Sequence, residues 1–356
     1  MIIAIKPGVK RELILEFSAT LEKMGVKIHL SEGATQTILG LVGDTTEIDE
    51  KALSAHHLVE KVIRVQEPYK RANRLFHPED TQVEIPGLDG EIRRIGGSSL
   101  GIIAGPCAVE SEEQIVGVAR DVKKAGAGFL RGGIFKPRTS PYSFQGMGVD
   151  GLDLLLAAKK ETGLPLVSEL MAIHQLELFD EIDVIQIGAR NMQNFSLLKE
   201  LSRVKKPILL KRGQSSTVTE LLMAAEYLMS GGNDQIILCE RGIRTFDSHS
   251  RNTLDLSAVP ALKKRTHLPV IVDPSHGTGY AWMVPSMAKA AIAAGADGVI
   301  IEVHNNPEAA LCDGEQSITP QEFSILMDQL RKYADIEGRT IGTFAPSILA
   351  DCMRAS

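Results

Sequence analysis

Side chains that could bind anions gather in one short stretch of this sequence. The segment FLRGGIFKPRTSPYSFQG, residues 129–146, begins as an apolar run and then places Arg131, Lys136 and Arg138 within eight residues. A buried cation is unfavourable unless an anion meets it. The stretch therefore indicates either ion pairs with the protein's own carboxylates or a site for an anionic ligand.

More cations follow other apolar runs along the chain. The full set after the runs is Arg131, Lys136, Arg138, Arg190, Lys211, Arg212, Arg241 and Arg244. The planar fork of arginine suits phosphate and carboxylate groups. If the runs are strands that end at one face, these cations would line a common mouth. We expect that mouth to bind a ligand with several negative charges, such as two phosphorylated molecules, although ion pairs within the protein are the alternative for each single residue.

A second group of residues has the types found in metal sites. Cys107, His276, Glu302 and Asp313 follow the first, seventh and eighth apolar runs or the loop after the eighth. A thiolate, an imidazole and two carboxylates suit Mn²⁺, Fe²⁺, Co²⁺ or Zn²⁺ better than Ca²⁺. Cys107 could instead be a small buried packing residue, and His276 could orient a ligand without binding the metal.

The elements that must position these residues form a repeating pattern. The apolar runs are LGIIAG, GFLRG, PLVSE, VIQIG, PILLK, QIILCE, PVIVD and GVIIE, with helix-like segments such as residues 111–126 and 217–232 between them. Such continuous runs are typical of parallel strands that are covered on both faces. The pattern predicts an α/β fold in which residues 99–336 form a (β/α)₈ TIM barrel. An open doubly wound sheet is the alternative, and the lack of a Gly-rich nucleotide loop favours the barrel.

Barrel closure explains how the candidate residues could meet. The active face of such a barrel lies at the C-terminal ends of its strands. The first and eighth strands become neighbours when the barrel closes, so the four metal-ligand candidates can lie together although the sequence separates them.

Residues outside the barrel have a different pattern. Residues 1–70 alternate short strands and helices in the order βαββαβ, which predicts a small ferredoxin-like α+β domain. Residues 71–98 read as a linker and a hairpin. Residues 337–356 form a C-terminal extension to which we assign no role.

Composition excludes several classes of function. The net charge of −6 argues against a general nucleic-acid binder, and the longest apolar runs are too short to cross a membrane. The four cysteines lack the spacing of a disulfide framework, and the first residues lack the layout of a secretory signal. We therefore expect a cytoplasmic protein, in which Cys239 and Cys312 are small buried residues.

Several motifs together resemble one enzyme family. The segments AGPCAVES, LRGGIFKPRTSPYSFQG, QIGARNMQNF, LLKRG, LCERGIRTF, NTLDLSAVP, VDPSHGTG and IEVHNNPEAALCDGEQS are similar to those of the 3-deoxy-D-arabino-heptulosonate 7-phosphate (DAHP) synthases, in the shorter bacterial class related to 3-deoxy-octulosonate 8-phosphate synthase. The resemblance runs from about residue 70 to residue 335. It implies the transferase reaction that opens the shikimate pathway of aromatic amino acid biosynthesis, in which phosphoenolpyruvate and erythrose 4-phosphate condense.

The resemblance also implies roles for individual residues. The divalent metal would be held by Cys107, His276, Glu302 and Asp313. Phosphoenolpyruvate would be bound by Arg131, Lys136, Arg190, Lys211 and Arg241. Erythrose 4-phosphate would meet the loop that contains Lys136, Pro137, Arg138, Thr139 and Ser140. Glu240 and His304 are further substrate-binding candidates. We expect Lys136 to donate a proton to the new alkoxide and Glu169 to handle the water, with Cys107 catalytic through the metal.

Two other functions fit parts of the sequence. The octulosonate synthase uses arabinose 5-phosphate, but its loop usually reads closer to Lys-Ala-Asn-Arg-Ser-Ser, whereas this chain has KPRTS. A non-catalytic sensor is disfavoured because all the proposed ligands are present. One departure from the family lies at residues 280–283, where Tyr-Ala-Trp-Met replaces the charged residues that often follow DPSHGTG.

The N-terminal domain resembles the regulatory domain of some DAHP synthases. This resemblance implies allosteric inhibition by tyrosine or phenylalanine at a subunit contact in a homotetramer. The alternating segment KIHLS offers His29 and Ser31 as side chains that could bind such an effector, and ordinary surface polarity is the alternative for both.

Overall fold

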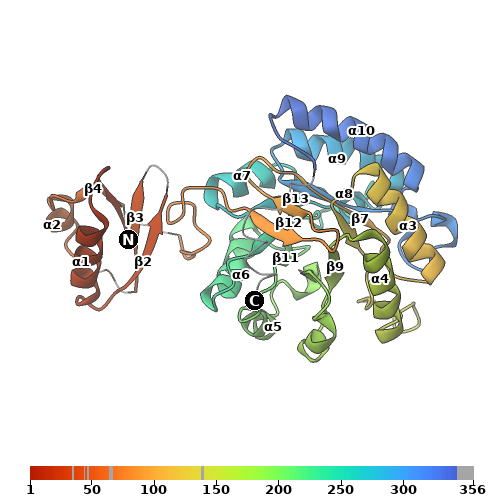
Figure 1. Cartoon of the computed structure of the whole chain (residues 1–356), viewed down its shortest axis with the longest axis horizontal. Helices are drawn as coiled ribbons and strands as arrows, with labels where there is room; N and C mark the ends of the chain where they lie inside the picture. The colour runs from red at the N-terminus through yellow and green to blue at the C-terminus, as the bar shows by residue number, and fades with distance from the viewer. Residues whose placement is uncertain (34–35, 44, 46–47, 64–66, 138–139, 343–356) are drawn as a thin grey trace. The chain divides into compact units, whose positions relative to one another are not determined.

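The computed structural model describes residues 1–33, 36–43, 45, 48–63, 67–137 and 140–342. It divides the chain into two compact units, Met1–Asp80 with Lys264–His267, and Thr81–Lys263 with Leu268–Ser356 (Figure 1). Across the described part of the chain, every helix is too short or too polar to span a membrane.

The first unit has the expected ferredoxin-like fold. Its elements are β1 (Ile2–Ile5), α1 (Arg11–Glu22), β2 (Lys27–Glu32), β3 (Thr37–Val42), α2 (Glu50–Ser54) and β4 (Val59–Ile63). The antiparallel sheet has the strand order β2-β3-β1-β4, so β2 is an edge strand. The βαββαβ order that the sequence predicts is confirmed.

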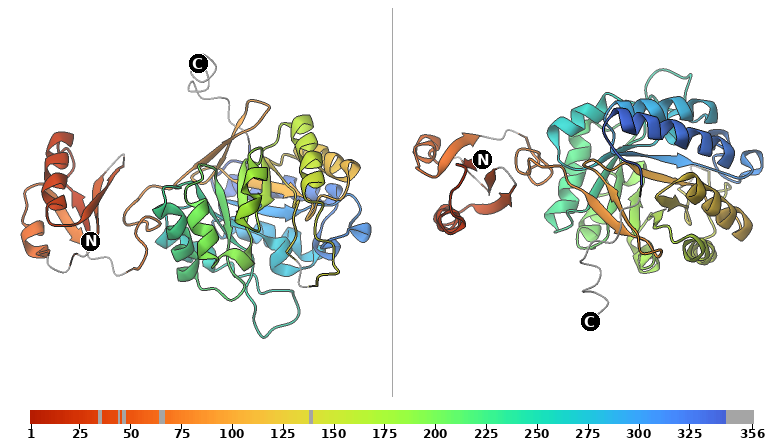
Figure 2. Two further views of the ribbon diagram at one scale, coloured as in Figure 1. Left: turned by 90° about the horizontal axis from the view of Figure 1, so that it is seen from below. Right: turned by 45° about the horizontal axis from the view of Figure 1, so that its top comes forward.

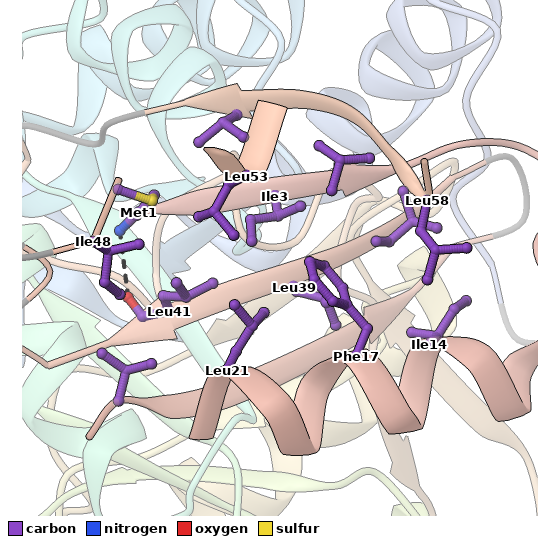
Figure 3. Packing of buried hydrophobic residues seen from close by; sticks show 14 residues of the cluster. Met1, Ile3, Ile14, Phe17, Leu21, Leu39, Leu41, Ile48, Leu53 and Leu58 are labelled. Carbon is purple, nitrogen blue, oxygen red and sulfur yellow. Dashed lines mark hydrogen bonds between the residues drawn. The ribbon is translucent and has the colours of Figure 1, made fainter. Parts of the chain in front are cut away.

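The helix α1 packs on this sheet through apolar residues that recur at helical spacing. Ile14, Phe17 and Leu21 lie three and four positions apart, which places them on one face of the helix. They point at Leu39 and Leu41 of β3 in the buried cluster of Figure 3. Burial of side chains of this size contributes about 1.5–3 kcal/mol each, so the domain has a core of its own.

The opposite face of the sheet is covered by a residue from beyond β4. Phe76 packs against Ile2 and Ile38. Its ring would lie 2.2 Å from a Cβ atom at position 40, which explains why β3 has glycine there.

The second unit is a closed barrel of eight parallel strands, as the sequence predicts. The strands are β7 (Gly101–Gly105), β8 (Phe129–Arg131), β9 (Leu166–Glu169), β10 (Val184–Ile187), β11 (Ile208–Lys211), β12 (Ile236–Glu240), β13 (Val270–Val272) and β14 (Gly298–Glu302). Pairing of β14 with β7 closes the ring. The outer layer, visible in Figures 1 and 2, contains α3 (Glu112–Ala125), α4 (Val149–Thr162), α5 (Phe195–Leu201), α6 (Val218–Ser230), α7 (Ala258–Arg265), α9 (Val284–Ala293) and α10 (Pro320–Ile336).

One connection departs from the simple repeat. Between β9 and β10 the chain forms the 3₁₀ helix η1 (Ile173–Phe179) where a regular α-helix would be expected. The side chain of Gln175 accepts hydrogen bonds from the backbone N–H groups of Met171 and Ala172, at 3.0 and 3.1 Å. These bonds satisfy polar groups at the start of the turn and favour the tight winding.

A β-hairpin continues the barrel core at its N-terminal end. It consists of β5 (Val83–Pro86) and β6 (Ile92–Ile95), and it lies across the barrel in Figure 1. Val83, Ile85 and Ile95 join the cluster of inward-facing strand residues that includes Ile103 and Phe129. The site residues lie at the other end of the strands.

Candidate active site

The structure brings the four predicted metal ligands together. One ligand atom each from Cys107, His276, Glu302 and Asp313 lies within 4.8 Å of all the others. The Cys107 thiol donates to Asp313 Oδ2 at 3.1 Å, and His276 Nε2 lies 3.3 Å from Glu302 Oε1. Strand pairing between β7 and β14 makes this possible, because Cys107 follows β7 by two residues and Glu302 ends β14.

A short helix fixes the orientation of His276. The helix α8 (Pro274–Thr278) begins directly after β13, and Asp273 caps it by accepting from the His276 backbone N–H at 2.9 Å. The other oxygen of Asp273 bonds to His276 Nδ1 at 2.8 Å, which leaves Nε2 facing the cluster. Burial lowers the pKa of His276, so the imidazole is neutral, as a metal ligand must be.

The two oxygens of the Glu302 carboxylate differ in their hydrogen bonds. Its Oε2 accepts from Gln316 Nε2 at 2.7 Å. Its Oε1 is buried and accepts no hydrogen bond from the described atoms, although the Arg131 guanidinium lies 3.1 Å away. A buried oxygen in this condition, beside a thiol, an imidazole and a second carboxylate, fits a divalent metal ion.

Asp313 is held in an unusual backbone conformation. Among the described residues it is the one non-glycine residue with positive φ, at 53°. Burial raises the pKa of its carboxyl group, but the neighbouring His276 ring, the hydrogen bond from the Cys107 thiol and the charge of Arg251 outweigh burial and lower the pKa well below the ordinary value. The side chain is therefore ionised and faces the other three ligands.

Cys107 lies between a cation and a second thiol. Lys136 Nζ is 2.8 Å from the Cys107 sulfur and 3.0 Å from its carbonyl oxygen. The Cys312 sulfur is 3.5 Å from that of Cys107, and this contact, with burial, raises the pKa of the Cys107 thiol well above its ordinary value. Cys239 and Cys312 are both buried, as the sequence predicts.

A cavity of about 280 Å³ opens beside the cluster. Its ionisable lining residues are Lys136, Glu169, Arg190, Lys211, Arg241, Arg251, His276 and Asp313, and Pro137, Ser140 and Gln186 also line it. Cations outnumber carboxylates in this lining. The cavity is therefore suited to an anionic ligand.

Arg241 supplies the strongest sign of that ligand. Only 4% of its surface is exposed, yet within the described part of the chain no carboxylate lies at salt-bridge distance from it. Its guanidinium donates to the carbonyl of Gly242 at 3.3 Å, and burial lowers its pKa. A buried cation that faces the cavity, with no carboxylate at salt-bridge distance among the described residues, fits an anionic ligand.

Glu169 reaches the cavity from the end of β9. Its Oε2 accepts from Gln186 Nε2 at 3.2 Å. Its Oε1 would lie 1.9 Å from a Cβ atom at position 188, so only glycine at that position leaves the carboxylate where it is.

Other predicted substrate residues lie outside this cavity lining. Glu240 is fully buried and binds Arg212 at 2.8 Å and the Gly242 N–H at 2.6 Å. His304 is buried with Nε2 3.4 Å from Glu110. Arg131 lies beneath the cavity beside Glu302, and Arg138 and Thr139 are outside the described residues.

The structure adds polar residues that the sequence analysis did not select. They are Gln186, Gln214, Arg251, Asn252, Asp273 and Gln316. Gln186 is the one polar side chain in the strand Val184–Ile187, and a lone polar residue in an apolar strand could have indicated it. Arg251 and Gln316 lie in loops, where spacing gives no such signal.

The predicted effector residues lie on the edge strand of the first unit. His29 and Ser31 of β2 are opposite Gly40 and Ile38 of β3, and both are half-buried. Alternation along a strand places them on one face of the sheet. The departure at residues 280–283 lies beside the barrel site, where Tyr280 lines a second hollow with Arg251 and Trp282 is 74% exposed.

Comparisons with known proteins agree with this geometry. Residues 79–336 match the model of the DAHP synthetase I family, and residues 1–67 match that of the DAHP synthase ferredoxin-like domain. The chain is 45% identical over 339 residues to a phospho-2-dehydro-3-deoxyheptonate aldolase of Thermotoga maritima, which covers 95% of this chain and 99% of that protein. A 2-dehydro-3-deoxyphosphooctonate aldolase of Geotalea uraniireducens is 34% identical, and its match covers 68% of this chain and 95% of that protein.

Solved structures give the same relationship. The crystal structure of the Thermotoga maritima DAHP synthase aligns with a TM-score of 0.75 and 44% identity, covering 95% of this chain and 98% of that one. A truncated form of the same synthase aligns with a TM-score of 0.70 over 76% of this chain and 97% of its own. The barrel with its cation-lined cavity and the ferredoxin-like unit, together with these relatives, define an enzyme of the TIM-barrel type. The chain belongs to the DAHP synthetase I family.

Proposed function

We propose that this enzyme condenses phosphoenolpyruvate with erythrose 4-phosphate and water to form DAHP and inorganic phosphate, with a divalent metal held by the four clustered ligands. The buried Arg241, which faces the cavity without a carboxylate partner among the described residues, carries the substrate part of this proposal. The cluster of Cys107, His276, Glu302 and Asp313 carries the metal part.

The cations first bring two anions together. Lys136, Arg190, Lys211 and Arg241 line one cavity and would bind the phosphate and carboxylate groups of phosphoenolpyruvate. Pro137 and Ser140 line the same cavity and would face the sugar phosphate, with Arg138 and Thr139 of the same loop. Holding two mutually repelling substrates in contact is a large part of catalysis, because it replaces an encounter in solution.

The proton transfers fall to Lys136 and Glu169. The terminal carbon of phosphoenolpyruvate attacks the aldehyde carbon, and water then adds at C2 so that phosphate can leave. Burial lowers the pKa of Lys136, but Cys107, Cys312 and Glu169 outweigh burial and raise it, so the side chain carries a proton for the new alkoxide. Glu169 would orient the water. A divalent ion, when bound, would polarise the aldehyde oxygen as a Lewis acid; Mn²⁺, Fe²⁺, Co²⁺ and Zn²⁺ all suit the donor set.

Erythrose 4-phosphate is favoured over arabinose 5-phosphate by the extent of the relatives' match. The heptonate aldolase matches 95% of the chain, including the ferredoxin-like unit, whereas the octonate aldolase matches 68%. The test follows phosphoenolpyruvate loss with each sugar, with and without EDTA. We expect EDTA-sensitive loss with erythrose 4-phosphate; a preference for arabinose 5-phosphate would assign the sister activity.

A variant tests the metal ligands directly. Cys107→Ala should lose bound metal and turnover while its circular dichroism spectrum stays unchanged. Metal-dependent turnover by this variant would contradict the ligand assignment.

Regulation belongs to the ferredoxin-like unit in this proposal. An aromatic amino acid, tyrosine or phenylalanine, would bind near His29 and Ser31 on β2. That strand is an edge, and an edge strand presents free backbone groups that can pair with a second copy. We therefore place the effector at a contact within a homotetramer, in an enzyme that works in the cytoplasm.

A further inference from the structure

One loop of the barrel contacts two of the four clustered ligands directly and a third through Gln316. Residues 251 and 252 lie between β12 and α7, and their backbone N–H groups donate to the carbonyls of Thr278 and Gly277 at 2.8 and 3.2 Å. The side chain of Asn252 donates to the His276 carbonyl oxygen at 2.9 Å. The loop is therefore fastened to the helix that carries His276.

The Arg251 side chain extends from this loop to both carboxylate ligands. Its Nη1 lies 3.2 Å from Asp313 Oδ1 and donates to Gln316 Oε1 at 2.7 Å. Gln316 is 2% exposed, and its Nε2 donates a hydrogen bond to Glu302 Oε2 at 2.7 Å. Arg251 thus reaches Asp313 directly and Glu302 through Gln316.

These contacts determine which oxygen atoms face the cluster. Gln316 occupies Glu302 Oε2, so Oε1 is the oxygen left beside His276. Arg251 occupies Asp313 Oδ1, so Oδ2 is the oxygen that contacts Cys107. These partners also offset the repulsion between the two carboxylates, a task that Arg131, 3.1 Å from Glu302 Oε1, shares.

We propose that Arg251 and Gln316 are positioning residues, which hold the Asp313 and Glu302 carboxylates in the arrangement that binds the metal ion. The inference rests on the proposed metal site. It goes beyond that site because neither residue supplies a ligand atom to the cluster. It also separates Arg251 from the other cations of the cavity, which are assigned to substrate.

The test measures metal affinity of the full-length, chelator-treated protein by calorimetric titration with Mn²⁺. Removal of a group that orients a metal ligand typically weakens metal affinity by about 10–100-fold. We expect losses in this range for Gln316→Leu and for Arg251→Ala. The double variant should lose less than the product of the two single losses, because Arg251 acts partly through Gln316.

A spectroscopic readout separates positioning from general damage. With Co²⁺, a thiolate-to-metal absorption band reports the bond to Cys107. The variants should keep this band at saturating Co²⁺ although they need more metal to reach it. Arg203→Ala is the matched control, since this exposed arginine pairs with Glu200 on α5, away from the site; its affinity should equal that of the unmodified chain. Folding of each variant is checked by circular dichroism. The Arg251 side chain is 42% exposed, so Arg251→Ala should fold and can carry the test by itself if Gln316→Leu does not fold.

Three outcomes are distinguishable. Failure of the unmodified protein to bind Mn²⁺ or Co²⁺ would overturn the proposed metal site itself. Unchanged metal affinity in both variants, with a higher KM for the sugar phosphate in Arg251→Ala, would overturn the inference alone and assign Arg251 to substrate. Weakened affinity with the cobalt band retained supports the positioning role.

Discussion

Each proposed metal ligand has a neighbour that fixes its orientation. Asp273 holds His276, Gln316 holds Glu302, Arg251 holds Asp313, and Lys136 lies against the Cys107 sulfur. Such partners strengthen metal binding, because they decide which atom is presented to the metal. The chemistry of the site therefore depends on pairs of side chains.

A glycine provides a test of the Glu169 position. Gly188→Ala should lower kcat about as much as Glu169→Gln, because the new Cβ would lie 1.9 Å from the present place of Glu169 Oε1 and would displace the carboxylate. The backbone at residue 188 has φ −66°, which alanine adopts easily. The free energy of unfolding should then change by less than about 1 kcal/mol. Steady-state kinetics and urea unfolding measure both, and normal kcat in Gly188→Ala would remove Glu169 from the mechanism.

Lys136 can be tested as the proton donor. Lys136→Met keeps most of the side-chain volume but removes the ammonium group, so kcat should fall by about 10²–10⁴, the usual contribution of a positioned acid or base. Single-turnover measurements with saturating substrates separate this effect from weaker binding. A change confined to KM would mean that Lys136 only binds substrate.

At the scale of single residues, the sequence predicts which residues belong to the site better than it predicts which side chains they contact. The closed barrel brings Cys107 next to Glu302 by a general rule, so the cluster was accessible from strand order alone. Glu240 also ends a strand, but its carboxylate turns to Arg212 and the Gly242 backbone. Position at a strand end fixes the face of the barrel on which a side chain lies, whereas the neighbour that it contacts depends on packing.

Among the elements, the hairpin β5–β6 depends on a buried ion pair. Arg93, 2% exposed, donates to both oxygens of Asp89 at 2.7 Å. Burial raises the pKa of Asp89, but the hydrogen bonds and charge of Arg93 outweigh burial and lower the pKa to about 2. The pair therefore stabilises the hairpin while Asp89 is ionised.

Asp89→Asn should destabilise the barrel by about 3 kcal/mol at neutral pH, because the buried guanidinium loses its two short bonds to a carboxylate and keeps only the more distant Glu91, at 3.6 Å. The pKa of Asp89 is lower in the folded protein than in the unfolded chain, so its stabilisation is complete above about pH 4 and is lost as the pH falls towards 2. The difference in unfolding free energy between the two proteins should shrink over that range. Glu84→Gln, which removes an exposed partner of Arg94, is the control and should cost less than about 1 kcal/mol; equal effects of the two changes would contradict the role of burial.

Elements were more predictable than side-chain contacts. The eight apolar runs all became strands, because continuous apolar segments bounded by glycine, proline and charge have few other solutions. The helix between β9 and β10 was the exception. There the side chain of Gln175 bonds to two N–H groups, and such a local contact is invisible to periodicity.

At the scale of the whole molecule, the chain is modular. The first unit has its own core, and the described catalytic candidates all belong to the second unit. A protein that begins at Thr81 should keep condensation activity within a few fold and lose inhibition by tyrosine or phenylalanine. Initial rates with and without each amino acid measure both effects; inhibition that survives the truncation would place the effector site on the barrel.

The hairpin β5–β6, at the N-terminal end of the barrel strands, bears on how substrates and products enter and leave the barrel. Its apolar side chains add to a packed core, so within the described residues the cavity at the opposite end is where substrates would enter and products would leave. An anionic product that stayed in this cavity would occupy the cations that the next anionic substrate needs, so release of product should be slowed by the same charges that favour binding.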